Sequence, residues 1–128
     1  MDLTQSEALH AYAKMMNTLS VAPLEPLLAD DFTYESQWVF SALESKKAFL
    51  DYIKPKLQAI KAGTKAFAEM GMVHAYGEHQ PCVVLAQNSR SNLVGSVLAR
   101  VVNNKLSRLD LCAVPRPESA ERSGEYPV

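Results

Sequence analysis

Residues 29–40, ADDFTYESQWVF, are the stretch on which the rest of the chain depends. Side chains of a β-strand alternate between two faces, so Phe32, Tyr34, Trp38 and Phe40 fall on one face with a single hydroxyl, Ser36, among them. The opposite face is mainly polar. We therefore expect a strand whose apolar face lines the core or a pocket, with the other elements wrapped around it.

The composition is typical of one soluble globular domain. The chain has 128 residues, of which 48% are hydrophobic and 21% charged, enough apolar material for a sizeable core. The 13 basic and 14 acidic residues nearly balance and form no basic stripe, so we expect no nucleic-acid partner. No apolar run reaches the roughly 18 residues of a membrane span, and the N-terminus does not resemble a signal peptide. These features predict a cytoplasmic protein with no membrane partner.

A first helix is predicted over residues 4–19. Thr4 and Glu7 form a capping box at its start, and apolar residues recur at three- and four-residue spacing along it. Pro23 can open a second, short helix, since proline is tolerated in a first turn. We expect the following aspartates, Asp30 and Asp31, to end that helix and lead into the strand.

A third helix is predicted over residues 46–61. Ser45 is suited to cap its N-terminus, and Pro55 should kink it. Phe49, Tyr52 and Ile53 belong to its apolar stripe. We assign its lysines to a solvated face and not to a phosphate site.

The chain changes to strand patterns after this helix. We expect four strands, over residues 64–75, 80–89, 92–103 and 105–114. Helices followed by a run of strands predict an α+β fold, in which a strongly curved, mainly antiparallel sheet wraps around the N-terminal helices as a cone with a central pocket. This arrangement forms a single domain over residues 1–114. Residues 115–128 are predicted to be a polar, mobile tail.

The last two strands should meet in a two-residue turn at Asn103 and Asn104, because asparagine tolerates the positive φ of such turns. A turn this tight pairs Leu98 with Leu109 and Arg100 with Ser107. It also places Asp110 opposite Val97, on the other sheet face from Arg100. The residues that share parity with Val97 would then form an exposed apolar strip on the outer face: Val97, Ala99 and Val101. We expect a homodimer to cover this strip.

The order of elements resembles the nuclear transport factor two-like superfamily, including its SnoaL-like branch. The resemblance covers about residues 3–114 and is carried by segments 27–32 (LLADDF), 45–50 (SKKAFL) and 104–110 (NKLSRLD) in this order. It departs from the family at Ser45, where many relatives have glycine. The resemblance implies a cone of curved sheet around three helices, open at one end, and dimers are common among such proteins.

The resemblance includes the ketosteroid isomerases of this superfamily, whose functional positions can be matched to residues of this chain. Ser36 falls at the position of their general base, Tyr12 at that of an oxyanion donor, and Leu98 near their second donor. A serine hydroxyl cannot replace a carboxylate as base near neutral pH, so we expect no isomerase activity of this kind. The Asp-Arg-Asp set of epoxide hydrolases of this fold is not evident either, since Arg100 and Asp110 are expected on opposite faces.

Other clusters of reactive residues have simpler interpretations. His74, Glu78 and His79 surround a predicted turn, where a polar loop is favoured over a metal site. Cys82 and Cys112 lie on strands expected to be separated by a third strand, beyond disulfide reach, so we expect two packed thiols. We expect no metal and no cofactor.

Two charged residues lie inside apolar strands, Glu69 and Arg100. Buried charges are costly unless they are paired. Either they form the polar end of a pocket, or they lie on the outer sheet face or in an interface. Both alternatives stay open at this point.

Two functions therefore remain. The first is a small-molecule-binding protein or cofactor-independent enzyme that holds a hydrophobic molecule with one polar end in the cone. Its candidate ligand-binding residues are Tyr12, Tyr34, Ser36, Trp38, Glu69 and Arg100. We expect Trp38 to face the cavity or its mouth, among Met16, Phe49 and Ile53. The alternative is a non-catalytic homodimeric protein-interaction module.

Overall fold

The protein is described by a computed structural model that covers residues 2–38 and 41–128. Its main elements are two helices, α1 and α2, and a six-stranded sheet. In chain order the elements are α1 (Gln5–Thr18), the 3-10 turn η1 (Glu25–Leu27), β1 (Leu28–Ser36), α2 (Lys46–Gly63), β2 (Ala66–Ala75), β3 (Glu78–Gln87), β4 (Leu93–Val102), β5 (Lys105–Cys112), η2 (Pro117–Ser119) and β6 (Glu121–Arg122). This order confirms the predicted α+β class.

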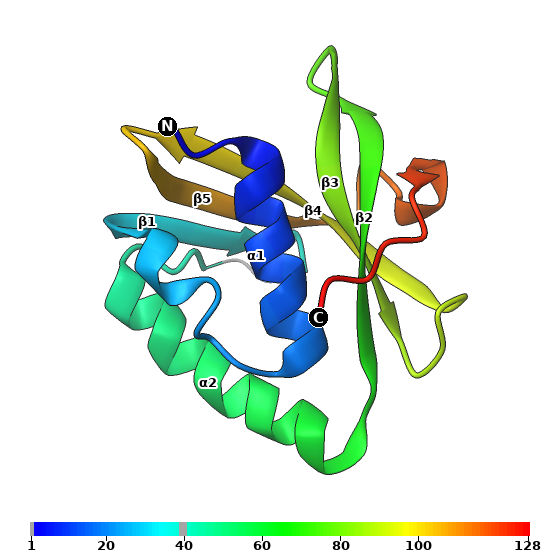
Figure 1. Ribbon diagram of the computed structural model, residues 1–128, viewed down its shortest axis with the longest axis horizontal. Helices are drawn as coiled ribbons and strands as arrows, with labels where there is room; N and C mark the ends of the chain where they lie inside the picture. Colours follow the sequence, from blue (N-terminus) through cyan, green and yellow to red (C-terminus); the bar gives the residue numbers. More distant parts are fainter. Residues whose placement is uncertain (1, 39–40) are drawn as a thin grey trace.

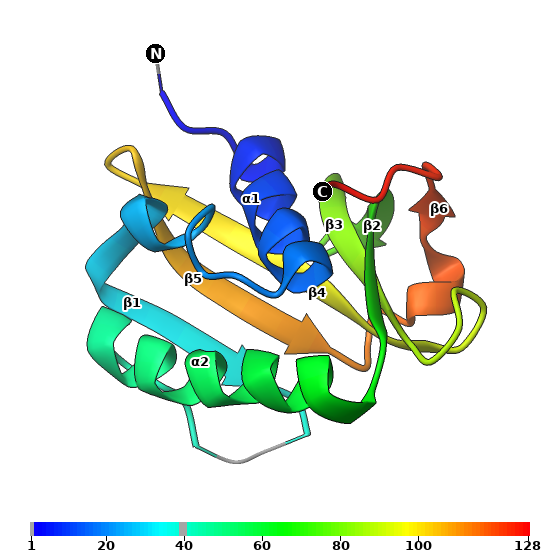
Figure 2. The same cartoon turned by 60° about the horizontal axis from the view of Figure 1, so that its bottom comes forward.

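The strands follow the order β1-β5-β4-β3-β2-β6 in one open sheet. Only β1 and β5 pair in parallel; the other neighbours are antiparallel. Helix α1 packs against β2, β3 and β4, and α2 packs against β1. Figures 1 and 2 show the sheet curving around these helices, which lie on its concave side. The predicted curved, mainly antiparallel sheet is therefore confirmed.

Both long helices begin where the sequence predicts. Thr4 accepts a hydrogen bond from the Glu7 amide at 3.1 Å, and Glu7 Oε1 accepts one from the Thr4 amide at 2.9 Å, which completes the capping box. Ser45 Oγ accepts from the Ala48 amide at 3.0 Å at the start of α2. Pro55 lies inside α2. Neither α1 nor α2 combines the length and hydrophobicity that crossing a bilayer would need.

Strand β1 has the predicted alternation. Phe32, Tyr34 and Ser36 are buried on the concave side, whereas Glu35 is exposed. The strand already begins at Leu28, so the two aspartates lie within it and do not end a helix. The expected continuation through Val39 and Phe40 lies outside the described residues.

The turn between β4 and β5 has the predicted form, but the pairing beyond it differs. Asn103 and Asn104 have φ angles of 52° and 63°, as a two-residue turn requires. The register then shifts after Val101, and Arg100 pairs with Arg108. Ser107 is the extra residue of this β-bulge, and its hydroxyl donates to the Arg100 carbonyl at 3.1 Å.

Because of the bulge, the residues of β4 that were expected to face outward face the core, and those expected to face the core face outward. The predicted pairing was therefore wrong. Leu98 pairs with Asp110 and not with Leu109. Val97 and Ala99 are buried in the core beneath the helices, and Val101 packs against that core. The strip expected on the outer face therefore lies inside the molecule. The homodimer stays a prediction, without this strip as its support.

The C-terminal segment also differs from the mobile tail predicted. Strand β6 pairs with β2 at Gly71 and Met72, and the Met70 amide donates to the Glu125 carbonyl at 2.9 Å. A Cβ atom on Gly71 would lie 2.9 Å from the Glu121 carbonyl oxygen, so glycine permits this close approach. The first part of the segment, with η2, lies against β4 on the convex side, beside what we call the convex cluster: Val73, Ala75, Cys82, Val84, Leu98 and Cys112. Strand β6 then forms the sheet edge, and the last residues reach α1, where Asn17 Nδ2 donates to the Pro127 carbonyl at 2.8 Å.

Candidate functional site

A pocket of about 280 Å³ lies at one end of the cone, where β1, β3 and β5 end and β2 and β4 begin. Helix α2 closes its side with its C-terminal half. We call it the open-end pocket. The described residues that line it are Met16, Trp38, Lys56, Ile60, Thr64, Ala66, Leu85, Ala86, Gln87, Val94 and Leu111.

Trp38 forms part of the pocket rim. Its backbone amide donates to Ser36 Oγ at 3.2 Å, and the chain turns after β1 at this point. The side chain is 60% exposed because it follows the strand and does not continue its alternation. Met16 lines the same pocket, whereas Phe49 and Ile53 are buried in the core and are not among the lining residues.

Lys56 is the only charged residue among the described residues that line this pocket. Its ammonium donates a hydrogen bond to the Tyr52 hydroxyl at 2.9 Å and lies 5.3 Å from the centre of the Tyr52 ring. The two residues are four positions apart on α2, so they share one face of the helix. Tyr52 therefore holds the lysine head in place.

Aromatic rings connect this pair to the core. The Tyr52 ring lies 5.7 Å from that of Tyr34, which lies 5.3 Å from Phe49; Phe49 meets Phe32 edge-to-face at 5.0 Å. Burial, with smaller contributions from neighbouring tyrosines, raises the pKa of both Tyr12 and Tyr34 well above the ordinary value. Both phenols therefore stay neutral at physiological pH.

The structure separates the residues that the sequence grouped into one site. Tyr12, Tyr34 and Ser36 are buried on the concave side but do not line the open-end pocket, and Trp38 does. Glu69 and Arg100 lie on the opposite side of the sheet, which is one of the two alternatives that the sequence left open.

Glu69 is only 3% exposed, and its charge is compensated. The carboxylate accepts from Arg122 Nε at 2.6 Å and from the Gly124 amide at 2.8 Å. Arg100 is exposed and pairs across the ladder with Arg108. Neither Glu69 nor Arg100 therefore lines the open-end pocket.

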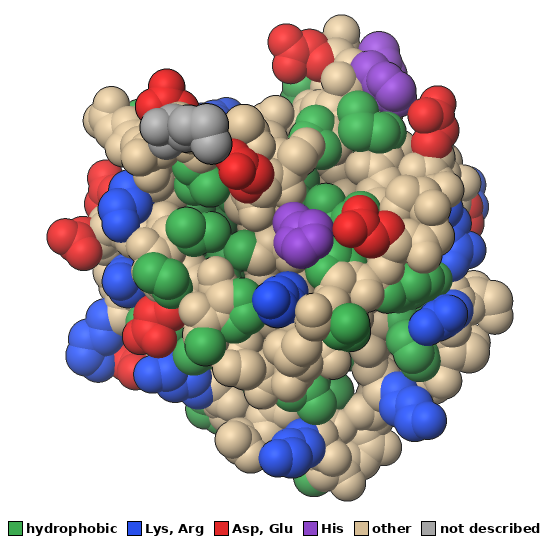
Figure 3. Space-filling view, viewed as in Figure 1, with side chains coloured by type: hydrophobic (Ala, Val, Ile, Leu, Met, Phe, Trp, Pro, Cys, Tyr) green, Lys and Arg blue, Asp and Glu red, His purple; other side chains and the backbone are tan. Residues whose placement is uncertain are grey.

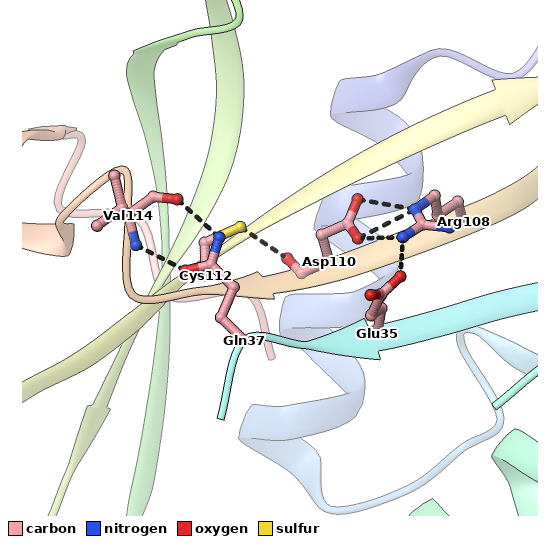
Figure 4. A network of polar contacts seen from close by, with 6 residues as sticks. All are labelled: Glu35, Gln37, Arg108, Asp110, Cys112 and Val114. Carbon is pink, nitrogen blue, oxygen red and sulfur yellow. Dashed lines mark hydrogen bonds and ion pairs between the residues drawn. The ribbon is translucent and has the colours of Figure 1, made fainter. Parts of the chain in front are cut away.

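A polar network occupies the convex face where β1 and β5 run side by side (Figure 4). Arg108 Nε donates to both oxygens of Asp110, at 3.0 and 3.1 Å, and its guanidinium also contacts Glu35. These contacts raise the pKa of Arg108. The register shift brings Asp110 to the same face as Arg100, contrary to the sequence prediction, but Asp110 bonds to Arg108. The network joins two strands and surrounds no described pocket.

The remaining reactive residues form no evident centre. The described part of the chain contains no group of three or more His, Cys, Asp and Glu side chains placed to hold a metal ion. His79 lies 3.6 Å from Glu121, as a loosely paired surface residue. Cys82 and Cys112 are free and buried, as predicted, and burial raises the pKa of each thiol to about 11.

Sequence reasoning missed Lys56, which it assigned to a solvated face. Figure 3 shows why: basic and acidic side chains are interspersed along the lower left of the molecule, where α2 lies. One signal was present in the sequence. A tyrosine four residues before a lysine places a hydroxyl beside the ammonium, whereas Lys47 meets an acid, Asp51, at the same spacing.

No family model and no curated protein matches this sequence significantly. Solved structures do match it in shape. An NTF2-like protein of unknown function from Cytophaga hutchinsonii has a TM-score of 0.61 at 14% identity, over 92% of this chain and 96% of its own. A SnoaL-like protein of unknown function from Burkholderia thailandensis has a TM-score of 0.59 at 12% identity, over 97% and 100%. A candidate polyketide cyclase from Sinorhizobium meliloti has a TM-score of 0.55 at 14% identity, over 80% and 90%.

The fold is that of the nuclear transport factor two-like proteins. This confirms the resemblance drawn from the sequence, at the level of the fold alone. One residue that the sequence matched to a ketosteroid isomerase donor lies elsewhere in the structure. Leu98 lies in the convex cluster and not near the interior, and the inward-facing residues beside it, Val97 and Ala99, are apolar. Neither they nor Ser36 supplies a carboxyl group.

Proposed function

We propose that the protein binds a small apolar molecule with one polar end in the open-end pocket. The observation that carries this proposal is the composition of the pocket wall. An indole at the rim and aliphatic side chains from α2, β3 and β5 surround a space with few polar groups. This is the usual composition of small-molecule sites.

The size of the pocket limits the ligand. About 280 Å³ is just below the usual range of ligand sites, so a small molecule fits better than a drug-sized one. The name of one similar structure, a candidate polyketide cyclase, is consistent with a small-molecule role. No carboxylate lines the pocket among the described residues, so proton abstraction by a carboxylate is not part of the proposal.

Trp38 provides a direct test, because it is the only tryptophan in the chain. A panel of compact apolar molecules is titrated against the protein while Trp38 fluorescence and the thermal midpoint are followed. A ligand of this pocket should change the fluorescence saturably and raise the midpoint by mass action. Trp38→Ala should weaken binding, measured by thermal shift. Tyr76→Ala, which removes an aromatic ring that is 78% exposed and does not line the pocket, should not.

The absence of saturable binding across a broad panel would contradict the proposal. The homodimeric interaction module would then be the function to test. Light scattering at micromolar concentration distinguishes a dimer from a single chain of 14.1 kDa.

A further inference from the structure

The open-end pocket has an unbalanced charge. Lys56 is the one residue with a charged side chain among the described lining residues; the others are apolar or neutral. A single positive charge at the edge of an apolar wall favours an anion whose apolar part can contact the wall at the same time. The lining therefore favours a ligand that carries one negative charge.

The charge of Lys56 is also uncompensated among the described residues. Lys47, on the same helix, forms an ion pair with Asp51 at 2.6 Å. Lys56 takes part in no ion pair among the described residues; its hydrogen-bond partner is the neutral hydroxyl of Tyr52. An ammonium group has three donors, so two remain for a ligand after this bond.

The ammonium already has one hydrogen-bond partner before any ligand arrives. The Tyr52 hydroxyl accepts from it at 2.9 Å, and the Tyr52 ring packs against the tilted ring of Tyr34, with the ring centres 5.7 Å apart. Fixing a flexible lysine in advance reduces the entropy that binding must spend on ordering it. Tyr52 thus acts as a positioning residue for Lys56.

We propose that the polar end of the ligand is a carboxylate bound by Lys56, and that the ligand is a compact apolar monocarboxylate. This inference rests on the proposed function, which it makes specific. One lysine balances one negative charge, and the carboxylate oxygens can accept the remaining ammonium donors. The apolar body of the ligand then lies against Trp38, Leu85 and Leu111.

The test compares two probes of nearly equal shape, octanoate and octanamide, by titration of the full chain. Octanoate should bind about tenfold more tightly, as expected for a charge-assisted hydrogen bond at a partly exposed site. This preference should shrink at high salt, because the lysine is exposed. Lys56→Met should remove the preference by weakening octanoate binding much more than octanamide binding, and Lys56→Arg should restore part of it.

Two variants control for other causes. Lys54→Met makes the same charge change on the same helix but does not alter the pocket wall, so the preference for octanoate should persist. Tyr52→Phe keeps the ring and removes the hydroxyl. It should weaken octanoate binding about two- to fivefold and leave octanamide binding unchanged, an effect that a merely structural role would not produce.

The outcomes separate this inference from the proposed function. Equal binding of octanoate and octanamide, or equal effects of Lys56→Met and Lys54→Met, overturns the carboxylate site and leaves the small-molecule pocket standing. The same holds if neither probe binds while other apolar molecules of the panel do. If nothing in the panel binds, the proposed function fails, and the carboxylate site fails with it.

Discussion

The two faces of this sheet are both apolar at their centre, yet they are covered in different ways. The concave face is packed under α1 and α2, where Phe32, Val97 and Leu109 are fully buried. The convex face is flanked by the chain's own last residues, with Val84, Leu98 and Cys112 in its cluster. A helix supplies a continuous apolar stripe, whereas a short irregular segment does not. The second cover therefore depends more on hydrogen bonds and charge pairs.

The Glu69–Arg122 pair illustrates this dependence. The carboxylate is almost completely buried, while the arginine that compensates it comes from the covering segment. The Arg122 guanidinium also donates to the Arg90 carbonyl at 2.9 Å and to the Tyr126 hydroxyl at 3.2 Å, and Arg90 lies over the Tyr126 ring at 4.2 Å. The convex cover is therefore held by a few specific contacts, and the concave core by many non-specific ones.

The concave core should give the largest effect on stability. Phe49→Ala removes a ring that is 0% exposed and packs against both Phe32 and Tyr34. We expect the free energy of unfolding to fall by about 3–5 kcal/mol, because the cavity left behind adds to the lost burial. Urea denaturation measures this loss. Phe49→Leu should cost clearly less, and a loss for Phe49→Ala below about 1 kcal/mol would show that the core does not depend on this ring.

Substitutions in the segment that covers the convex face should give the second-largest loss of stability. Arg122→Met leaves the buried Glu69 with one remaining donor, the Gly124 amide, and should lower the free energy of unfolding by about 1–3 kcal/mol. Arg116→Met makes the same change at an exposed position of the same segment and should be nearly neutral.

Adding Glu69→Gln to Arg122→Met tests the coupling between the pair. The double variant should recover part of the loss, because it removes the unpaired buried charge. Strict additivity of the two substitutions would contradict the pairing of these side chains.

The two faces also differ in how well the sequence predicts them. The helices, their caps at Thr4 and Ser45 and the buried parity of β1 depend on patterns within a few residues, and they were predicted. The bulge at Ser107 was not, because one extra residue carries no periodic signal although it exchanges the faces of β4. The ordered C-terminal segment was missed for another reason, since its main contact joins residues 53 positions apart in the chain.

The residues of the candidate site were also only partly predictable, because several of their positions depend on turns and long-range contacts. Trp38 reached the mouth of the pocket through a turn after β1, not through the strand alternation used to place it. Glu69 and Arg100 were recognised as unusual charges. Their neighbours could not be predicted, because Arg100 faces Arg108 only through the β4–β5 register and Glu69 binds Arg122 of the C-terminal segment. Lys56 resembles any other exposed lysine of α2 until the structure shows which lysine lines a pocket.

The smallest expected effect is an absence of reaction at the two thiols. Cys82 and Cys112 are buried in the convex cluster, and burial raises the pKa of each to about 11, so both are covered and protonated at pH 8. Since the thiolate is the reactive form, a disulfide reagent should label the native protein only at the rate of unfolding, and should label it at once in urea.

Loosening the C-terminal segment sharpens the comparison of the two faces. Arg122→Met should increase the labelling rate at pH 8 more than Arg116→Met does, because only Arg122 holds the segment against Glu69. Rapid labelling of the unmodified protein under native conditions would contradict the packed segment and favour the mobile tail that the sequence predicts.

The same two thiols also make the stability of the protein depend on pH. The unfolded chain loses its thiol protons near the ordinary pKa of 9.0, before the folded chain does, so stability should fall as pH rises from about 9 towards 11. Thermal midpoints at pH 8 and 10 measure this fall, and it should be smaller when both cysteines are replaced by alanine.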